Sequence, residues 1–170
     1  DAIVHNQGVV LSIPETELNT KWTFAYQDIL PNGASVFEWI PKGEDINNWS
    51  ELIQIQFFPA SIFAKTPSAA EFSATFVNIL REKLPDVKYV EMKNGDSQLV
   101  EWTLSKEYRG EKPQVEIARF ISSPEGVYRI AYTKKAPISL DSETKKLWIE
   151  RLSQARLANL SSREKAGLTN

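Results

Sequence analysis

The sequence contains no cysteine, one histidine and one methionine among its 170 residues. Without cysteine there is no thiol nucleophile. The single histidine, His5, lies on a terminal segment that we expect to be too mobile for an acid/base relay. Most transition-metal sites draw their ligands from the same two residue types. These absences argue against most enzyme classes, and we expect no metal or other cofactor.

Strong charge imbalance and long apolar runs are missing as well. Twenty Lys and Arg residues stand against 22 Asp and Glu residues, a net charge of −2, so no basic surplus exists to neutralise nucleic-acid phosphates. No apolar run approaches the roughly 18 residues that a membrane-spanning helix needs. We expect a soluble protein with no nucleic-acid partner and no transmembrane segment. Its length predicts one domain over residues 1–160, followed by a flexible polar tail at 161–170.

The familiar catalytic motifs do not occur in a convincing context. Ser142 and Lys145 match the spacing of serine–lysine acylases, but they lie at an expected helix start, where serine caps and lysine is solvated. No glycine-rich phosphate loop, nucleophile elbow or calcium-loop spacing is present. Paired carboxylates remain open, because a glycosidase-type hydrolase needs only two of them across a cleft. The candidates are Glu38, Glu101 and Glu116, with Arg119 or Arg129 beside them.

What is present is a regular succession of strand and helix signals. Alternation and short apolar runs predict strands at residues 8–13, 21–27, 35–40, 51–58, 88–92, 98–105, 115–121 and 127–134. Turn signals such as Pro31-Asn32-Gly33 and Asn94-Gly95-Asp96 join neighbouring strands, and short turns favour antiparallel pairing.

Two main helices are expected. Ser68 caps the first, which ends before Pro85, and Asp141 or Ser139 caps the second. Their apolar sides comprise Ala69, Phe72, Phe76, Ile79 and Leu80, and Trp148, Leu152 and Ala155, respectively. The pattern predicts an α+β fold with a single antiparallel, mostly meander sheet of about seven or eight strands in β(4)-α-β(4)-α order.

Alternation also divides the expected sheet into an apolar face, covered by both helices, and a polar face. The apolar set is Ile53, Ile55, Phe57, Val100, Trp102, Leu104, Tyr128, Ile130 and Tyr132. The polar set is Gln54, Gln56, Glu101, Thr103, Arg129 and Thr133. The polar face is either a solvated surface with cross-strand pairs such as Glu101 with Arg129, or a platform that recognises a small ligand or peptide.

Arg119 and two tryptophans are candidates for a role beyond packing. Arg119 falls among apolar residues of its strand, so it either extends its charge from the core edge or pairs with a carboxylate. Trp39 and Trp49 flank a polar loop that contains Lys42, where they either stack a ligand or partner or close the end of the core. The other tryptophans, Trp22, Trp102 and Trp148, are expected in the core.

Two segments, 48–56 (NWSELIQIQ) and 129–135 (RIAYTKK), resemble segments of small exported proteins from gammaproteobacterial pathogens. Those proteins are mostly uncharacterised, and some look like substrates of secretion systems. The resemblance covers about residues 20–155 and implies export, which a first residue other than methionine also suits. The order of strands and helices looks like the PsbP/Mog1-type sandwich, which is associated with binding and assembly.

From the sequence we therefore expect a non-enzymatic binding or accessory protein, periplasmic or secreted after removal of a leader, that contacts another protein or a small ligand. The candidate binding residues are Trp39, Lys42, Trp49, Gln54, Gln56, Glu101, Arg119 and Arg129. Two alternatives stay open: a carboxylate-dependent hydrolase with its cleft on the polar sheet face, and a structural subunit of an envelope complex.

Overall fold

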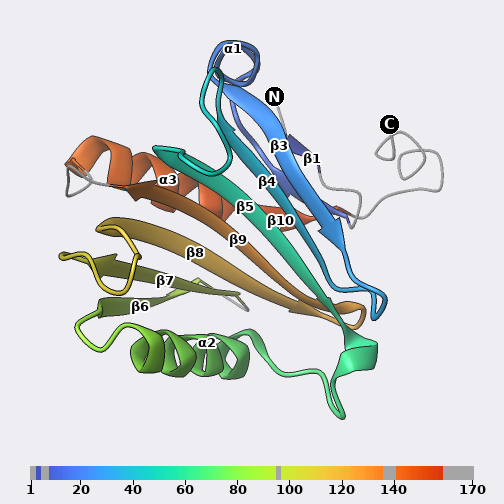
Figure 1. Ribbon diagram of the computed structural model, residues 1–170. Coiled ribbons are helices and arrows are strands. Elements are labelled where there is room, and N and C mark those ends of the chain that lie inside the picture. The colour runs from blue at the N-terminus through green and yellow to red at the C-terminus, as the bar shows by residue number, and fades with distance from the viewer. Residues whose placement is uncertain (1–2, 5–7, 95–96, 136–140, 159–170) are drawn as a thin grey trace.

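The computed structural model of the chain describes residues 3–4, 8–94, 97–135 and 141–158 (Figure 1). His5, the turn positions Gly95 and Asp96, the alternative cap Ser139 and the tail at 161–170 lie outside the described residues.

Seven strands form one antiparallel sheet in the order β3-β4-β5-β9-β8-β7-β6 (Figure 1). They are β3 (Trp22–Ile29), β4 (Ser35–Pro41), β5 (Glu51–Pro59), β6 (Lys88–Asn94), β7 (Ser97–Leu104), β8 (Gln114–Ser123) and β9 (Gly126–Lys135). Strands that follow one another in sequence pair as two meanders, and the meanders join where β5 pairs with β9. The predicted α+β class and antiparallel sheet are confirmed.

A second, smaller sheet has the order β1-β2-β10. It comprises β1 (Ile3–Val4), β2 (Val9–Leu11) and β10 (Arg156–Leu157), so the strand predicted at 8–13 belongs to this sheet and not to the main one. The side chains of Val9 and Leu11 are fully buried in the largest core cluster. Two short elements, α1 (Glu15–Thr20) and the 3₁₀ turn η1 (Ala60–Ile62), are too short for a periodic pattern to predict.

The two main helices, α2 (Ala69–Lys83) and α3 (Ser142–Gln154), begin where the capping signals predicted. The Ser68 hydroxyl accepts from the Glu71 backbone N–H at 3.1 Å, and the Asp141 carboxylate accepts from that of Thr144 at 2.8 Å. The predicted α2 stripe is wrong at Ile79, which is 47% exposed. A helix turns about 100° per residue, so the buried row that reaches Leu80 passes through Val77 instead.

The prediction of one helix-covered face is wrong, because α2 and α3 pack on opposite faces of the sheet (Figure 1). We call these the α2 face and the α3 face. Phe72, Phe76 and Val77 of α2 contact a cluster with Val100 and Phe120, whereas α3 packs into the cluster that contains the following residues: Ile53, Ile55, Tyr128, Ile130 and Tyr132.

Three apolar residues of β7 therefore lie on the face opposite to that of Ile53 and Ile55, with which they were predicted to share a face. Val100, Trp102 and Leu104 belong to the α2 face, together with Gln54 and Arg129. Alternation shows which residues of one strand share a face, but it does not show which faces of separate strands coincide. That match depends on the pairing register, so each face of the real sheet is part apolar and part polar.

Aromatic residues hold α3 against the sheet. The Tyr132 and Trp148 rings stack with centroids 4.1 Å apart, and Trp22 meets Trp148 edge to face at 6.1 Å. Trp22, Trp102 and Trp148 are all buried, which confirms their predicted core positions. None of the helices in the described part of the chain has the length and apolar character needed to cross a membrane.

Candidate functional site

A groove of about 530 Å³ lies on the α2 face, between α2, the sheet and the β7–β8 connection. Its lining residues are Phe76, Leu80 and Lys83 from α2 and the C-cap Leu84, Tyr108, Arg109 and Glu111 from the connection, and Gln54, Gln56, Trp102, Gln114 and Arg129 from the sheet. Three of the eight predicted binding residues, Gln54, Gln56 and Arg129, are thus brought together in one concave site.

The β7–β8 connection presents its side chains through a tight turn. Tyr108 and Glu111 exchange backbone hydrogen bonds of 3.0 and 2.9 Å across Arg109 and Gly110. Both central residues have positive φ, +47° and +84°, as a two-residue type I′ turn requires. The guanidinium of Arg109 lies over the Tyr108 ring, 5.4 Å from its centroid.

The floor of the groove rests on a buried ion pair. Arg129 Nη2 lies 2.5 Å from Glu116 Oε1, and both side chains are more than nine-tenths buried. The remaining hydrogen bonds of Glu116 come from neighbouring strands: Trp102 Nε1 donates to it at 2.5 Å and the Thr133 hydroxyl at 3.0 Å. Each of these groups satisfies the others, so the carboxylate is fixed in place.

The other side of Arg129 holds the two glutamines. Its Nη1 donates to Gln56 Oε1 at 3.0 Å and to Gln54 Oε1, and Gln54 Nε2 in turn donates to Glu38 at 2.9 Å. The Phe76 ring of α2 covers the guanidinium at 4.9 Å. Of the predicted polar set, Gln54, Gln56, Arg129 and Thr133 therefore share one face, part of which a helix covers. Glu101 and Thr103 lie on the other face.

Glu101 does not belong to this site. It lies on the α3 face, where its carboxylate pairs with Lys145 of α3 at 2.9 Å, so the predicted pair of Glu101 with Arg129 is wrong. The reason is the β7 register: Trp102 lies on the α2 face, and the residue before it must point the other way.

The Arg119 side chain binds the end of α3. Its Nη1 contacts the carbonyl oxygens of Leu152 at 2.8 Å, Ser153 at 2.7 Å and Ala155, at the C-terminus of α3. The last carbonyls of a helix lack partners within the helix and carry partial negative charge, so a cation stabilises them. Burial lowers the pKa of the Arg119 side chain.

The residues of the predicted tryptophan site are separated. Trp39 is half-buried and meets Phe24 on the α3 face at 5.5 Å, and Lys42 Nζ contacts the carbonyl oxygen of Asn19. Trp49 lies under the ammonium of Lys135, 3.6 Å from the ring centroid. None of the three lines the groove.

The carboxylates considered for a hydrolase are not gathered in a cleft either. Glu101 and Glu116 lie on opposite faces, and Glu116 is enclosed by its three partners. Among the described residues that line the groove, Glu111 is the one carboxylate. In the same part of the chain no three His, Asp or Glu side chains come together as around a metal ion.

Sequence reasoning missed Lys83, Tyr108 and Arg109. Lys83 is the last residue of α2 and Arg109 lies in a turn, and both positions are typical of solvated residues. No signal in the sequence places a helix end beside a distant turn. Packing of Tyr108 against the cluster of Leu80, Leu84 and Trp102 does so.

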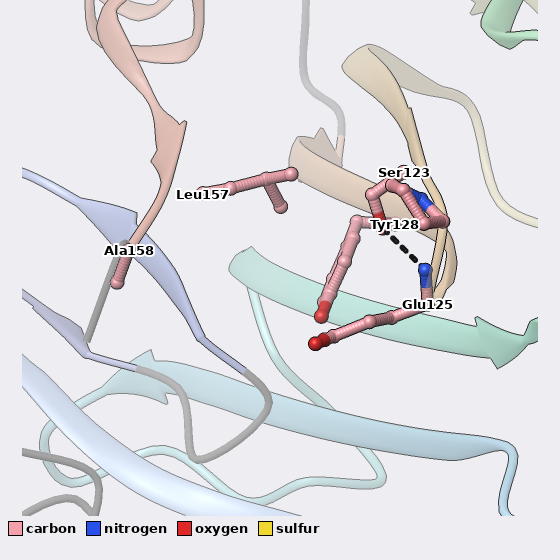
Figure 2. A pocket seen from close by; sticks show the side chains of 6 residues that line it. Ser123, Glu125, Tyr128, Leu157 and Ala158 are labelled. Atoms are coloured by element: carbon pink, nitrogen blue, oxygen red, sulfur yellow. Dashed lines mark hydrogen bonds between the residues drawn. The ribbon is translucent and has the colours of Figure 1, made fainter. Parts of the chain in front are cut away.

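A second pocket, of about 320 Å³, lies between the β8–β9 turn and the segment after α3. In Figure 2, Tyr128 and Glu125 point into it, and Leu157 and Ala158 stand opposite. The turn is tied by the Glu125 N–H, which donates to the Ser123 hydroxyl at 3.3 Å. Burial, followed by the charge of Glu125, raises the pKa of Tyr128 to about 12, so this phenol stays neutral at physiological pH.

A family model matches residues 18–163, which is most of the chain. The matched span contains both segments, 48–56 and 129–135, on which the resemblance to small exported proteins rests. A comparison with curated proteins gave no match. The likeness to the PsbP/Mog1-type sandwich is not shown by either comparison.

Proposed function

We propose that this chain, which belongs to the family matched over residues 18–163, is a non-enzymatic binding protein that holds a small ligand in the groove under α2. The observation that carries the proposal is the rigid polar floor. Arg129 is held by Glu116, Gln54 and Gln56 at the bottom of a groove of about 530 Å³. Sites for small ligands have about this volume and combine apolar walls with a few fixed polar groups.

Preorganisation supports binding over a purely structural interpretation. The polar groups of the floor are already held in one arrangement, so a ligand would not have to order them on binding. A solvated sheet face needs no such network, because water satisfies its side chains.

The carboxylate-dependent hydrolase has less support. Such an enzyme needs two carboxyl groups facing one another across the substrate. Glu116 makes its contacts with Arg129, Trp102 and Thr133, and Glu101 pairs with Lys145 on the other face. We therefore propose binding without catalysis.

The proposed location is the periplasm or the exterior of a bacterium. Support comes from the resemblance of residues 48–56 and 129–135 to segments of exported proteins, both within the span of the family match. Fractionation of cells that express the full gene with its native start tests this. Recovery of the protein only in the cytoplasm would contradict the proposed location without affecting the binding site.

A fragment screen by two-dimensional ¹H–¹⁵N NMR tests the binding proposal. We expect ligands to shift the signals of groove residues, including the Trp102 indole, and to bind Gln56→Ala more weakly than the parent protein. Gln27→Ala is the matched control, since Gln27 is an exposed glutamine on β3 outside the groove. Binding confined to other surfaces, or equal losses in both variants, would count against the groove.

A further inference from the structure

We infer that the ligand of this groove is a small organic anion, with its acidic group at Lys83 and Arg109 and an apolar body against the wall of α2. The inference rests on the proposed function and specifies its ligand class. It comes from the cations, the hydrogen-bond donors and the apolar surface that line the groove.

Lys83 and Arg109 are the cations available to a ligand. Both side chains are exposed and line the groove, and among the described residues neither forms an ion pair. Arg129, the third cation of the lining, is instead neutralised by Glu116. An acidic ligand group can therefore form charge-assisted hydrogen bonds with Lys83 and Arg109 without displacing an existing partner.

The packing places these two cations at the same end of the groove. Tyr108 packs against the cluster that contains Leu80 of α2 and the C-cap Leu84, so the turn that carries Arg109 lies beside the helix end that carries Lys83. One acidic group of a ligand can then contact both side chains.

The charges that line the groove leave a positive surplus, although the whole chain carries −2. In the described part of the chain, Lys83 and Arg109 stand against one carboxylate, Glu111, while Arg129 is neutralised by Glu116. Lys135, the cross-strand partner of Gln114, adds nothing to this charge, because its ammonium lies over the Trp49 ring and neither Lys135 nor Trp49 lines the groove. A local positive field on an acidic protein selects for negatively charged small molecules.

At the floor of the groove, the groups that lack a hydrogen-bond partner in the described part of the chain are donors. The oxygens of Gln54, Gln56 and Glu116 already accept from Arg129. In contrast, the Gln56 amide nitrogen and the buried Nε of Arg129 donate to no partner among the described residues. Free donors at the floor favour a ligand that carries acceptors, as carboxylates and phosphates do.

The rest of the wall is apolar. Leu80, Leu84 and Trp102 form a cluster with Tyr108 at its edge, and all four line the groove. An inorganic anion would leave this surface uncovered, whereas an acid with an aliphatic or aromatic body would bury it.

Fluorescence titration with two dyes of similar shape tests the charge preference. The anionic probe is 1-anilinonaphthalene-8-sulfonate and the uncharged probe is N-phenyl-1-naphthylamine, with NMR shifts used to locate each dye. We expect the anion to bind in the groove and to lose affinity by about tenfold in the double variant Lys83→Gln/Arg109→Asn. Asparagine tolerates the positive φ at position 109, so this variant should fold.

The matched control is Lys65→Gln/Lys146→Gln, which removes the same charge from exposed sites outside the groove. It should leave both dyes unaffected, and the uncharged dye should bind both double variants as it binds the parent. Displacement by 1-naphthoate and by 1-naphthyl phosphate then distinguishes a carboxylate ligand from a phosphate ligand.

The possible failures separate the two proposals. Equal affinity of the two dyes in the groove, or an equal loss in the control variant, overturns the anion inference and leaves the groove as a binding site. Absence of both dyes from the groove overturns the anion inference and counts against the proposed function as well.

Discussion

Arg129 and Glu116 form an ion pair of 2.5 Å between adjacent strands β9 and β8, with both side chains more than nine-tenths buried beneath α2. The pair connects the hydrogen bonds of Trp102 and Thr133 on one side to those of Gln54 and Gln56 on the other. It is therefore both the floor of the proposed site and part of the folded core.

Removal of one member of this pair should destabilise the protein strongly. In Arg129→Met the Glu116 carboxylate keeps its burial but loses its counter-charge, and we expect the free energy of unfolding to fall by about 3–5 kcal/mol. Urea denaturation measures the change. The double variant Arg129→Met/Glu116→Gln should recover part of the loss.

The more exposed pair of Lys145 with Glu101 supplies the control for that experiment. The Lys145 side chain is 43% exposed, so Lys145→Met should cost about 0–1 kcal/mol. Similar losses from Arg129→Met and Lys145→Met would show that burial does not set the strength of the inner pair.

Gly126 should not tolerate a side chain. Its φ is +148°, and an added Cβ would lie 2.2 Å from the Phe58 carbonyl oxygen and 2.9 Å from Pro59 Cα on β5. Gly126→Ala should therefore lower the thermal midpoint well below that of Gly43→Ala. Gly43 also has positive φ, +87°, but an added Cβ there meets nothing within 4 Å. Equal midpoints would mean that the β5–β9 contact relaxes without cost.

Loss of the α2 cap should have a moderate effect. The Ser68 hydroxyl accepts the Glu71 backbone N–H, and Ser68→Ala removes this bond at an expected cost of about 1 kcal/mol in chemical denaturation. Ser105→Ala, at an exposed serine outside the helices, should change the unfolding free energy little. A stability loss at Ser105 as large as that at Ser68 would argue against capping as the cause.

Glu17 should contribute to acid sensitivity. Burial acts to raise its pKa, but hydrogen bonding and charge from Arg151, together with Trp22 and Lys21, hold the pKa below the ordinary value of 4.5. A carboxyl group with a lowered folded-state pKa stabilises the fold above pH 4.5, and this stabilisation is lost as the pH falls through the folded-state pKa. Glu17→Gln should therefore be less stable than the parent at pH 7, and the difference should shrink in acid.

Unfolding midpoints across pH 2–7 test that prediction, a range of roughly two units below and above the ordinary carboxyl pKa. Glu82→Gln, an exposed carboxyl on α2 with no ion pair among the described residues, is the control and should differ little from the parent at any pH. A constant gap between Glu17→Gln and the parent would refute the linkage.

The elements were largely predictable because their signals are local. A capping serine or aspartate fixed the starts of α2 and α3, and alternation located the strands to within a few residues. The failures have a common cause. The strand predicted at 8–13 belongs to a second sheet, and β7 faces α2 with the side opposite to the predicted one. Both features depend on contacts between residues far apart in sequence, which local signals do not report.

The candidate site was predicted only in part for the same reason. Gln54, Gln56 and Arg129 share a face by alternation on paired strands, so sequence reasoning could group them. The ion pair of Glu101 with Lys145 and the contact of Arg119 with the end of α3 were not predicted, because the sequence does not determine where α3 packs.

By itself the sequence determined the α+β class, the antiparallel strands, the two capped helices and the scarcity of catalytic residue types, since each follows from neighbours along the chain or from composition. Only the tertiary structure decided that the helices cover opposite faces and that Lys83 and Arg109 line the same groove as Arg129. The physical reason is that register and helix docking are set by the burial of apolar area between distant segments, which no local pattern encodes.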